Sequence, residues 1–278
     1  MNIWNITRLA FLEARQRKLL WAVVLLGLAF LAVFGTGVYF MWRDVSQMSR
    51  GLARALEPIN FFLLAGLYGV DFLVVMLAVL TSVDAIAGEI TSGTIQTIAT
   101  KPLRRWEIVI GKWLGLAAML TVFAAVMSAA LMAIVWAITG YTPRNPLSGV
   151  ALIVLEGLIM LTLSILGGTR LSTLTNGVVV FMVWGLAFIA GWIEQIGAVL
   201  RNEAAVNVGI VVSLLAPSEA MWKRAAYLMQ PSFLRELGLD ATPFGAATAP
   251  SEAMVVYALL YTAVALGVAV YWFQRRDL

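Results

Sequence analysis

The sequence predicts an all-α membrane protein with six transmembrane helices, and its composition and its apolar runs lead to this prediction. Of its 278 residues, 62% are hydrophobic and 12% are charged, and the mean hydropathy is +0.91. Soluble domains carry about 25% charged residues, so most of this chain is expected to contact lipid. A helix needs roughly 20 apolar residues to cross a bilayer, and the chain has six such runs, at about 19–42, 60–86, 108–138, 149–168, 174–196 and 252–273.

Residues 1–18, before the first span, mix apolar and basic side chains. Ile3, Trp4 and Leu9 alternate with Arg8 and Arg15. This pattern is typical of an amphipathic helix that lies in the membrane interface with its basic end beside the headgroups. We therefore expect an interface helix here.

Clear turn signals bracket the fourth span. The stretch 139–146 contains Gly140, Pro143 and Pro146, and Gly167-Gly168 follows the span. These signals separate short, closely connected helices, so we expect residues 1–278 to form a single transmembrane domain.

Residues 197–251, between the fifth and sixth spans, form an external or re-entrant segment in this prediction. Within it, the strongly apolar stretch 206–216 ends at Pro217. About ten apolar residues cannot span a bilayer, so we expect a re-entrant or interfacial helix. The alternative is an ordinary external cap.

The basic residues favour an orientation with both termini inside. Of the 19 Lys and Arg residues, eleven fall on the side of the N-terminus under this topology and eight on the other. An excess of Lys and Arg near span ends marks the cytoplasmic side. We expect a multi-pass protein of a cytoplasmic membrane with its N- and C-termini inside.

The chain contains no Cys and no His, which excludes thiolate nucleophiles, Zn–His sites and Ser–His dyads. We therefore predict no metal site, and no cofactor bound by this chain. The net charge is +4, and we attribute it to basic loops at the membrane surface. Lys and Arg are not clustered with aromatic residues as they are in a nucleic-acid interface, so we expect no nucleic-acid partner.

Two carboxylates lie inside predicted spans, Asp71 in the second and Glu156 in the fourth. Intramembrane carboxylates are costly and point to function, so both are candidates for a substrate pathway. The alternative is a structural hydrogen bond to a neighbouring helix. Asp84 and Glu194 stand near span ends and are expected to be solvated. Gly111 and Gly115 form a G-x-x-x-G pattern, which predicts close helix packing.

A polar segment at 87–106 connects the second and third spans and has the pattern of a short amphipathic helix. Ser92 or Gly93 can cap it, Ile95 and Ile98 share one face, and Pro102 ends it. Such a helix cannot bury its apolar face alone, so it needs either lipid or the groove of a partner.

The spacing of Glu89, Gly93-Thr94, Pro102, Arg105 and Gly111-Lys112 resembles that of ABC transporter permeases of the type-two export family. The resemblance extends over essentially all 278 residues, through the basic N-terminal helix, six spans, re-entrant region and basic C-terminal end. Within that family the chain is similar to the permeases encoded with nitrous-oxide-reductase maturation factors.

This resemblance implies a prokaryotic exporter built from two copies of this permease, or a pair of like subunits, with two separate ATPase subunits that bind ATP and Mg. The second and fifth spans would line the dimer cavity, and 206–216 would form its outer gate. The short helix in the segment 87–106 would be the coupling helix, which docks in a groove of the ATPase. The residues for this contact would be Glu89, Gly93, Thr94, Ile95, Ile98, Pro102 and Arg105.

The sequence itself supports a separate ATPase, and we expect no enzymatic activity in this chain. It has no G-x-x-x-x-G-K-[S/T] motif, because Gly111-Lys112 is followed by Trp113. Two alternatives remain: an ion-coupled secondary transporter that uses Asp71 and Glu156, and an ABC mechanotransmitter that moves no solute. An intramembrane aspartyl enzyme is disfavoured, since Asp71 and Asp84 would lie about 20 Å apart on one helix.

Overall fold

The computed structural model describes residues 3–16, 18–48, 52–88, 104–232, 244 and 250–276, and these residues form helices and no strands. Six helices are long and apolar enough to cross a membrane, as predicted. They are α2 (Lys18–Met48), α3 (Leu52–Ser82), α6 (Arg105–Thr139), α7 (Pro146–Gly168), α8 (Thr173–Val199) and α12 (Glu252–Gln274).

Local sequence signals set several helix ends. Helix α6 stops at Gly140, whose φ of 72° is favourable for glycine, and α7 begins with Pro146 in its first turn. The Ser172 hydroxyl caps α8 by accepting a hydrogen bond from the Thr175 amide. The second span starts earlier than predicted, because α3 begins at Leu52 and continues through Pro58.

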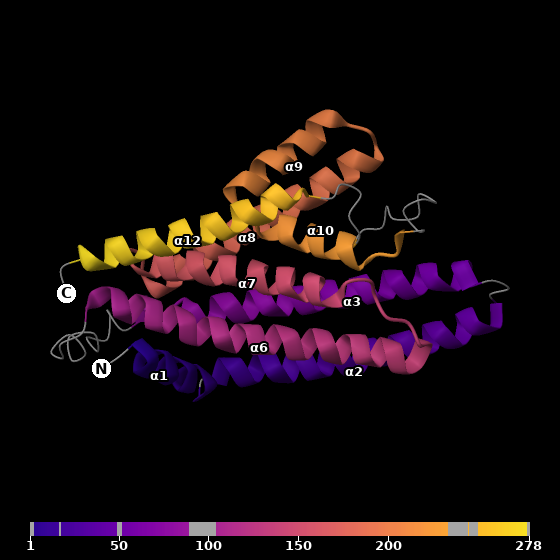
Figure 1. Ribbon diagram of the computed structural model, residues 1–278, viewed down its shortest axis with the longest axis horizontal. Coiled ribbons are helices and arrows are strands. Elements are labelled where there is room, and N and C mark those ends of the chain that lie inside the picture. The colour runs from indigo at the N-terminus through magenta and orange to yellow at the C-terminus, as the bar shows by residue number, and fades with distance from the viewer. Residues whose placement is uncertain are drawn as a thin grey trace.

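The six long helices lie side by side along the long axis of the molecule, with both chain termini at one end (Figure 1). We call this the terminal end and the opposite one the far end. Helices α3 and α7 are the most buried of the six. Their side chains form the centre of the core, with Leu63 and Leu67 from α3 and Ile153 and Ile159 from α7 fully buried.

Helix α1 (Ile3–Gln16) packs against the first turns of α6. Ile6 and Ala10 are buried there, whereas Trp4 is 73% exposed, so the helix is amphipathic as predicted. A methyl group at Gly115 would lie 2.6 Å from the carbonyl oxygen of Thr7. The G-x-x-x-G pattern therefore serves close packing within one chain, and the interfacial position of α1 stays a prediction.

The segment after α8 forms two helices, α9 (Glu203–Leu215) and α10 (Ser218–Met229), which meet at an angle of 112°. Asn202 caps α9 through its side chain, and the bend falls at Ala216–Pro217, where proline prevents a continuous helix. Helix α9 folds back along α8 (Figure 1). This geometry fits a re-entrant hairpin or a broken span.

The sequence prediction did not include α10, which inserts into the bundle and packs mainly against α7. Met221, Trp222 and Met229 are at most 2% exposed. Part of the 197–251 segment is thus core rather than an external cap. The predicted coupling residues Glu89, Gly93, Thr94, Ile95, Ile98 and Pro102 lie outside the described residues.

Candidate functional site

The two intramembrane carboxylates predicted from sequence come together at the centre of the bundle. Asp71 on α3 is 2% exposed and Glu156 on α7 is fully buried. They interact electrostatically with each other and with Glu219 of α10. One oxygen of Asp71 and both oxygens of Glu156 have no hydrogen-bond partner among the described residues. Buried polar groups are normally paired, so these oxygens mark an incomplete polar site.

Helix α10 adds a carboxylate and an ammonium group, Glu219 and Lys223, one turn apart on the same face. Both are buried, at 8% and 4% exposure. The Tyr68 hydroxyl on α3 donates to Glu219 Oε1 over 3.5 Å. Since α10 enters the bundle at Pro217, this face points toward α3 and α8 instead of toward water.

A buried ion pair joins α10 to α8: Lys223 Nζ lies 2.8 Å from Glu194 Oε2. The expectation that Glu194 is solvated is wrong, because this residue is only 8% exposed. Its burial arises from α9, which folds back over the end of α8. Asp84, the other carboxylate expected in water, is half-buried.

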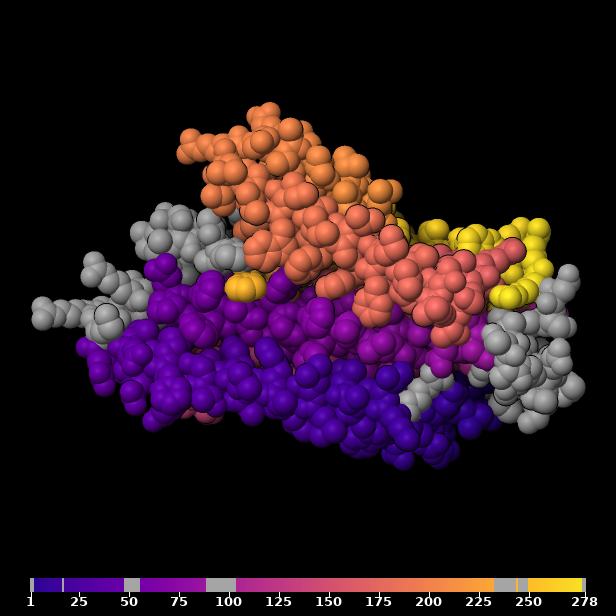
Figure 2. Space-filling model, turned by 180° about the vertical axis from the view of Figure 1, so that it is seen from behind, coloured from indigo at the N-terminus to yellow at the C-terminus, as the bar shows by residue number. Residues whose placement is uncertain are grey.

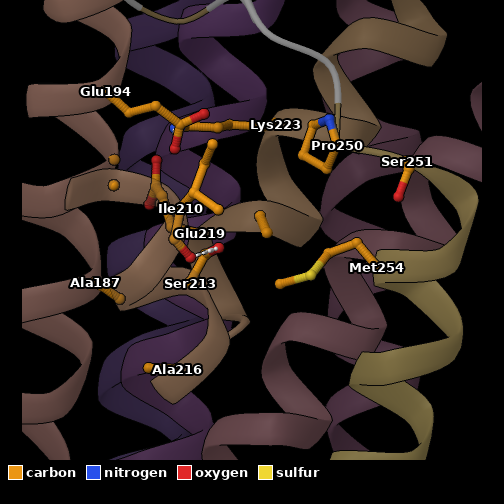
Figure 3. Close-up of a pocket in the computed structure, with 13 residues that line it drawn as sticks. Ala187, Glu194, Ile210, Ser213, Ala216, Glu219, Lys223, Pro250, Ser251 and Met254 are labelled. Carbon is orange, nitrogen blue, oxygen red and sulfur yellow. Dashed lines mark hydrogen bonds and ion pairs between the residues drawn. The ribbon is translucent and has the colours of Figure 1, made fainter. Parts of the chain in front are cut away.

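A cavity of about 290 Å³ lies beside this ion pair, between α8, α9, α10 and the start of α12. Glu194, Glu219 and Lys223 gather on one side of it, and Met254 lies on the other (Figure 3). The remaining lining is mostly small or apolar: Ala187, Gly191, Gly209, Ile210, Ser213, Ala216, Ala220, Pro250 and Ser251.

Two glycines leave room for the two carboxylates of this cavity. A methyl group at Gly191 of α8 would lie 3.0 Å from the Cδ atom of Glu219 and would overlap its Cγ atom. A methyl group at Gly209 of α9 would lie 2.8 Å from Glu194 Oε2. The helix backbones therefore approach the carboxylates more closely than any other residue type allows.

Helices α3 and α8 lie side by side on the face shown in Figure 2, and aromatic rings make contacts between the two helices. Phe72 contacts Trp184 with ring centroids 5.5 Å apart, and Trp184 contacts Phe188 at 5.4 Å. Phe188 stacks on Tyr68 at 6.2 Å, and Tyr68 meets Trp222 at 4.8 Å. The row ends beside Glu219.

The same two helices border an apolar groove of about 560 Å³ nearer the terminal end. Its lining comes from the last turns of α3 and the first turns of α8: Val79, Leu80, Val83, Thr173, Leu174, Gly177, Val178, Phe181 and Met182. The α3–α8 face is thus apolar at the terminal end, aromatic in the middle and acidic beside α10.

The terminal end is held by cations that donate to backbone carbonyl oxygens. The buried Lys112 Nζ lies 2.6 Å from the oxygen of Ala85, which joins the start of α6 to the residues after α3. Arg105 donates to the carbonyls of Gln274 and Arg276, and Arg276 to that of Thr169. Arg105, the predicted coupling residue that the structure describes, therefore contacts the C-terminal end.

Sequence comparisons agree with this architecture. The pattern of the ABC-2 family transporter proteins matches residues 4–278. The chain belongs to the ABC-2 transporter family. It is also similar to the probable ABC transporter permease protein NosY of Stutzerimonas stutzeri, with 32% identity over 114 residues. That alignment covers 41% of this chain and 38% of the relative, so the chain matches about two fifths of that protein's length.

The chain is thus a member of the ABC-2 transporter family with six helices that can cross a membrane. Its sequence indicated Asp71 and Glu156 as site residues, but not Glu219 and Lys223. A signal for them was present, because Pro217-Ser218-Glu219 is a typical helix start and places Lys223 one turn after Glu219. Polar segments between spans usually lie outside the membrane, so the sequence did not indicate a buried helix here.

Proposed function

We propose that this permease subunit couples to a separate ATPase and exports its substrate from the terminal end toward the far end. The observation that carries the proposal is the family match over residues 4–278 in a chain without a nucleotide-binding motif. The terminal end would then be cytoplasmic, in a prokaryotic inner membrane, which agrees with the distribution of Lys and Arg. ATP and Mg would be bound by the partner.

The coupling segment would lie between α3 and α6, whose ends are tied by Lys112. Residues 89–103 connect these helices in the sequence, and the Lys112–Ala85 hydrogen bond closes the connection at its base. A displacement of the segment by an ATPase would therefore move α3 and α6 together. Helix α3 carries Tyr68 and Asp71, so the movement would reach the buried carboxyl groups around α10.

The α3–α8 face would line the transport path, completed by a second copy of this chain or a like subunit. Support comes from its continuous apolar and aromatic surface. At the far end the α9–α10 pair would act as the outer gate. Its 112° bend and its polar contacts with α3 and α8 allow a movement of α10 to open the path.

The test is co-purification of the tagged chain with its candidate ATPase, followed by measurement of ATP hydrolysis. Gly93→Trp, placed in the predicted coupling helix, is expected to weaken the complex or uncouple hydrolysis. Gly267→Trp is the matched control, because a Cβ atom added at Gly267 on α12 has no neighbour within 4 Å among the described residues. A wild-type chain that binds no ATPase would refute the proposal.

The unpartnered oxygens of Asp71 and Glu156 favour one alternative, an ion-coupled carrier. Such a carrier would work in proteoliposomes without any ATPase and would respond to an imposed proton gradient. Asp71→Asn would then abolish the response. Transport that depends on ATP and is unaffected by the gradient would exclude this alternative.

A further inference from the structure

We propose that the cavity between α8, α9, α10 and α12 is a binding site for a small organic cation that carries an ammonium or quaternary ammonium group. Its polar side consists of Glu219 and the Glu194–Lys223 pair, and its apolar side includes Ile210 and Met254. The inference deepens the proposed function by naming a ligand class. It rests on the cavity itself, so it can fail or hold independently of ATPase coupling.

The first argument is a surplus of carboxyl groups. Asp71, Glu156, Glu194 and Glu219 are all buried, and Lys223 is the ammonium group that faces them among the described residues. The neighbouring Arg224 is directed elsewhere, since it donates to the carbonyl of Pro250 and pairs with Glu252. A buried carboxylate is costly unless it is protonated or paired with a cation, and a cationic ligand beside Glu219 would supply such a partner.

The second argument is that Glu219 has acceptor capacity left for a ligand. Lys223 is directed to Glu194, at 2.8 Å, so the polar partners of Glu219 among the described residues are Tyr68, through a long hydrogen bond, and Lys223, through a longer-range attraction. A carboxylate offers about four acceptor sites, so Glu219 can also bind a cationic group in the cavity that it lines.

The third argument is the shape of the cavity. Its volume of about 290 Å³ exceeds the roughly 30 Å³ that one water molecule occupies in the liquid, so a group of several heavy atoms fits. Among the described residues no cluster of three Asp or Glu side chains has a geometry that could hold a metal ion. Ala187, Ala216 and Met254 offer an apolar surface (Figure 3) suited to the methyl or methylene groups of an organic cation.

The fourth argument is that the backbone is shaped around the carboxylates. Gly191 and Gly209 allow Glu219 and Glu194 to occupy space that a Cβ atom would fill. Both glycines also line the cavity. A carboxylate retained only by chance at a helix interface would not require two such close approaches from two different helices.

The experiment uses the purified full-length chain in nanodiscs of phosphatidylglycerol, without an ATPase. Binding of choline is measured by isothermal titration calorimetry and compared with binding of 3,3-dimethyl-1-butanol, which has the same shape but no charge. We expect choline to bind and the neutral compound to bind at least about tenfold more weakly. Equal binding of the two compounds, or no choline binding at millimolar concentration, would overturn the proposal.

Three variants locate the site. Glu219→Gln should weaken choline binding at least about tenfold, whereas Glu203→Gln, on the exposed first turn of α9, should leave it unchanged. Met254→Trp fills the cavity from α12 without altering a charge and should also abolish binding. It keeps the test decisive if Glu219→Gln does not fold. Unchanged affinity in both cavity variants would refute the assignment.

The ammonium group can come from a free solute or from a lipid headgroup. Nanodiscs that contain phosphatidylcholine distinguish the two sources, since a lipid headgroup in the cavity would compete with free choline. We expect free choline to bind equally well in both kinds of nanodisc, because the charged side chains that line the cavity, Glu194, Glu219 and Lys223, are buried between helices. Binding lost in phosphatidylcholine nanodiscs would overturn the assignment to a free solute.

Discussion

Charged side chains are handled in opposite ways at the two ends of this bundle. At the terminal end, Lys112, Arg105 and Arg276 donate to backbone carbonyls of neighbouring helix ends, so each cation ties two chain segments together. Around α10, buried carboxyl groups gather instead, and several of their oxygens have no hydrogen-bond partner among the described residues. The cations of the terminal end therefore have backbone partners, whereas part of this acidic region lacks them.

The largest effect is expected from Lys223→Met, because it leaves Glu194 buried without its ammonium partner. Removing one member of a buried ion pair costs about 3–5 kcal/mol. Thermal unfolding of the purified chain should show this loss, and the double variant Lys223→Met/Glu194→Gln should recover much of it. A single variant as stable as wild type would mean that the acidic region does not depend on this pair.

Lys112→Met tests how much a cation-to-carbonyl hydrogen bond at the terminal end contributes to stability. It leaves the carbonyl of Ala85 without this donor, and losing a hydrogen bond to a charged group costs about 1.5–3 kcal/mol. We expect a lower unfolding temperature, and weaker stimulation of the ATPase in the complex. Lys18→Met, on an exposed position of α2, is the control and should change neither quantity.

Gly115→Ala tests whether α1 packs against α6 of the same chain at the terminal end. The added methyl group meets the backbone of Thr7 at 2.6 Å, and overpacking of this kind costs about 1–3 kcal/mol. Thermal unfolding of the purified chain should show this loss. Gly267→Ala, where no atom of the described residues lies within 4 Å of the added Cβ, should leave the stability unchanged.

The smallest effect is expected from Glu252→Ala, which removes the carboxylate that pairs with Arg224. The side chain of Glu252 is 91% exposed, and exposed ion pairs contribute about 0–1 kcal/mol. A double-mutant cycle with Arg224→Ala measures the coupling. A coupling energy equal to that of Lys223 and Glu194 would contradict the distinction between the buried and the exposed pair.

The sequence predicted the spans well because their signals are local. Twenty or so apolar residues must form a helix in lipid, so the six spans followed from composition, and Gly140, Pro146 and Pro217 set the breaks between helices. The role of Gly111 and Gly115 in close packing also followed from spacing. The packing partner did not, since the same G-x-x-x-G pattern serves contacts within a chain and between chains.

The acidic site was predictable in part. Asp71 and Glu156 were identified because a carboxylate inside an apolar run stands out in any sequence. Glu194, Glu219 and Lys223 could not be recognised in this way, since they lie near span ends or in a polar segment where charge normally meets water. Their burial depends on α9 and α10 folding back into the bundle.

The sequence by itself therefore determined that this protein is a helical membrane protein with six spans, and the coupling segment between its second and third spans stays a prediction. Only the tertiary structure decided that α10 enters the core, that Lys223 pairs with Glu194, and that a cavity forms beside Glu219. The physical reason is the range of the interactions. Helix formation in lipid depends on neighbouring residues, whereas the burial of a charge depends on helices that are distant in the sequence.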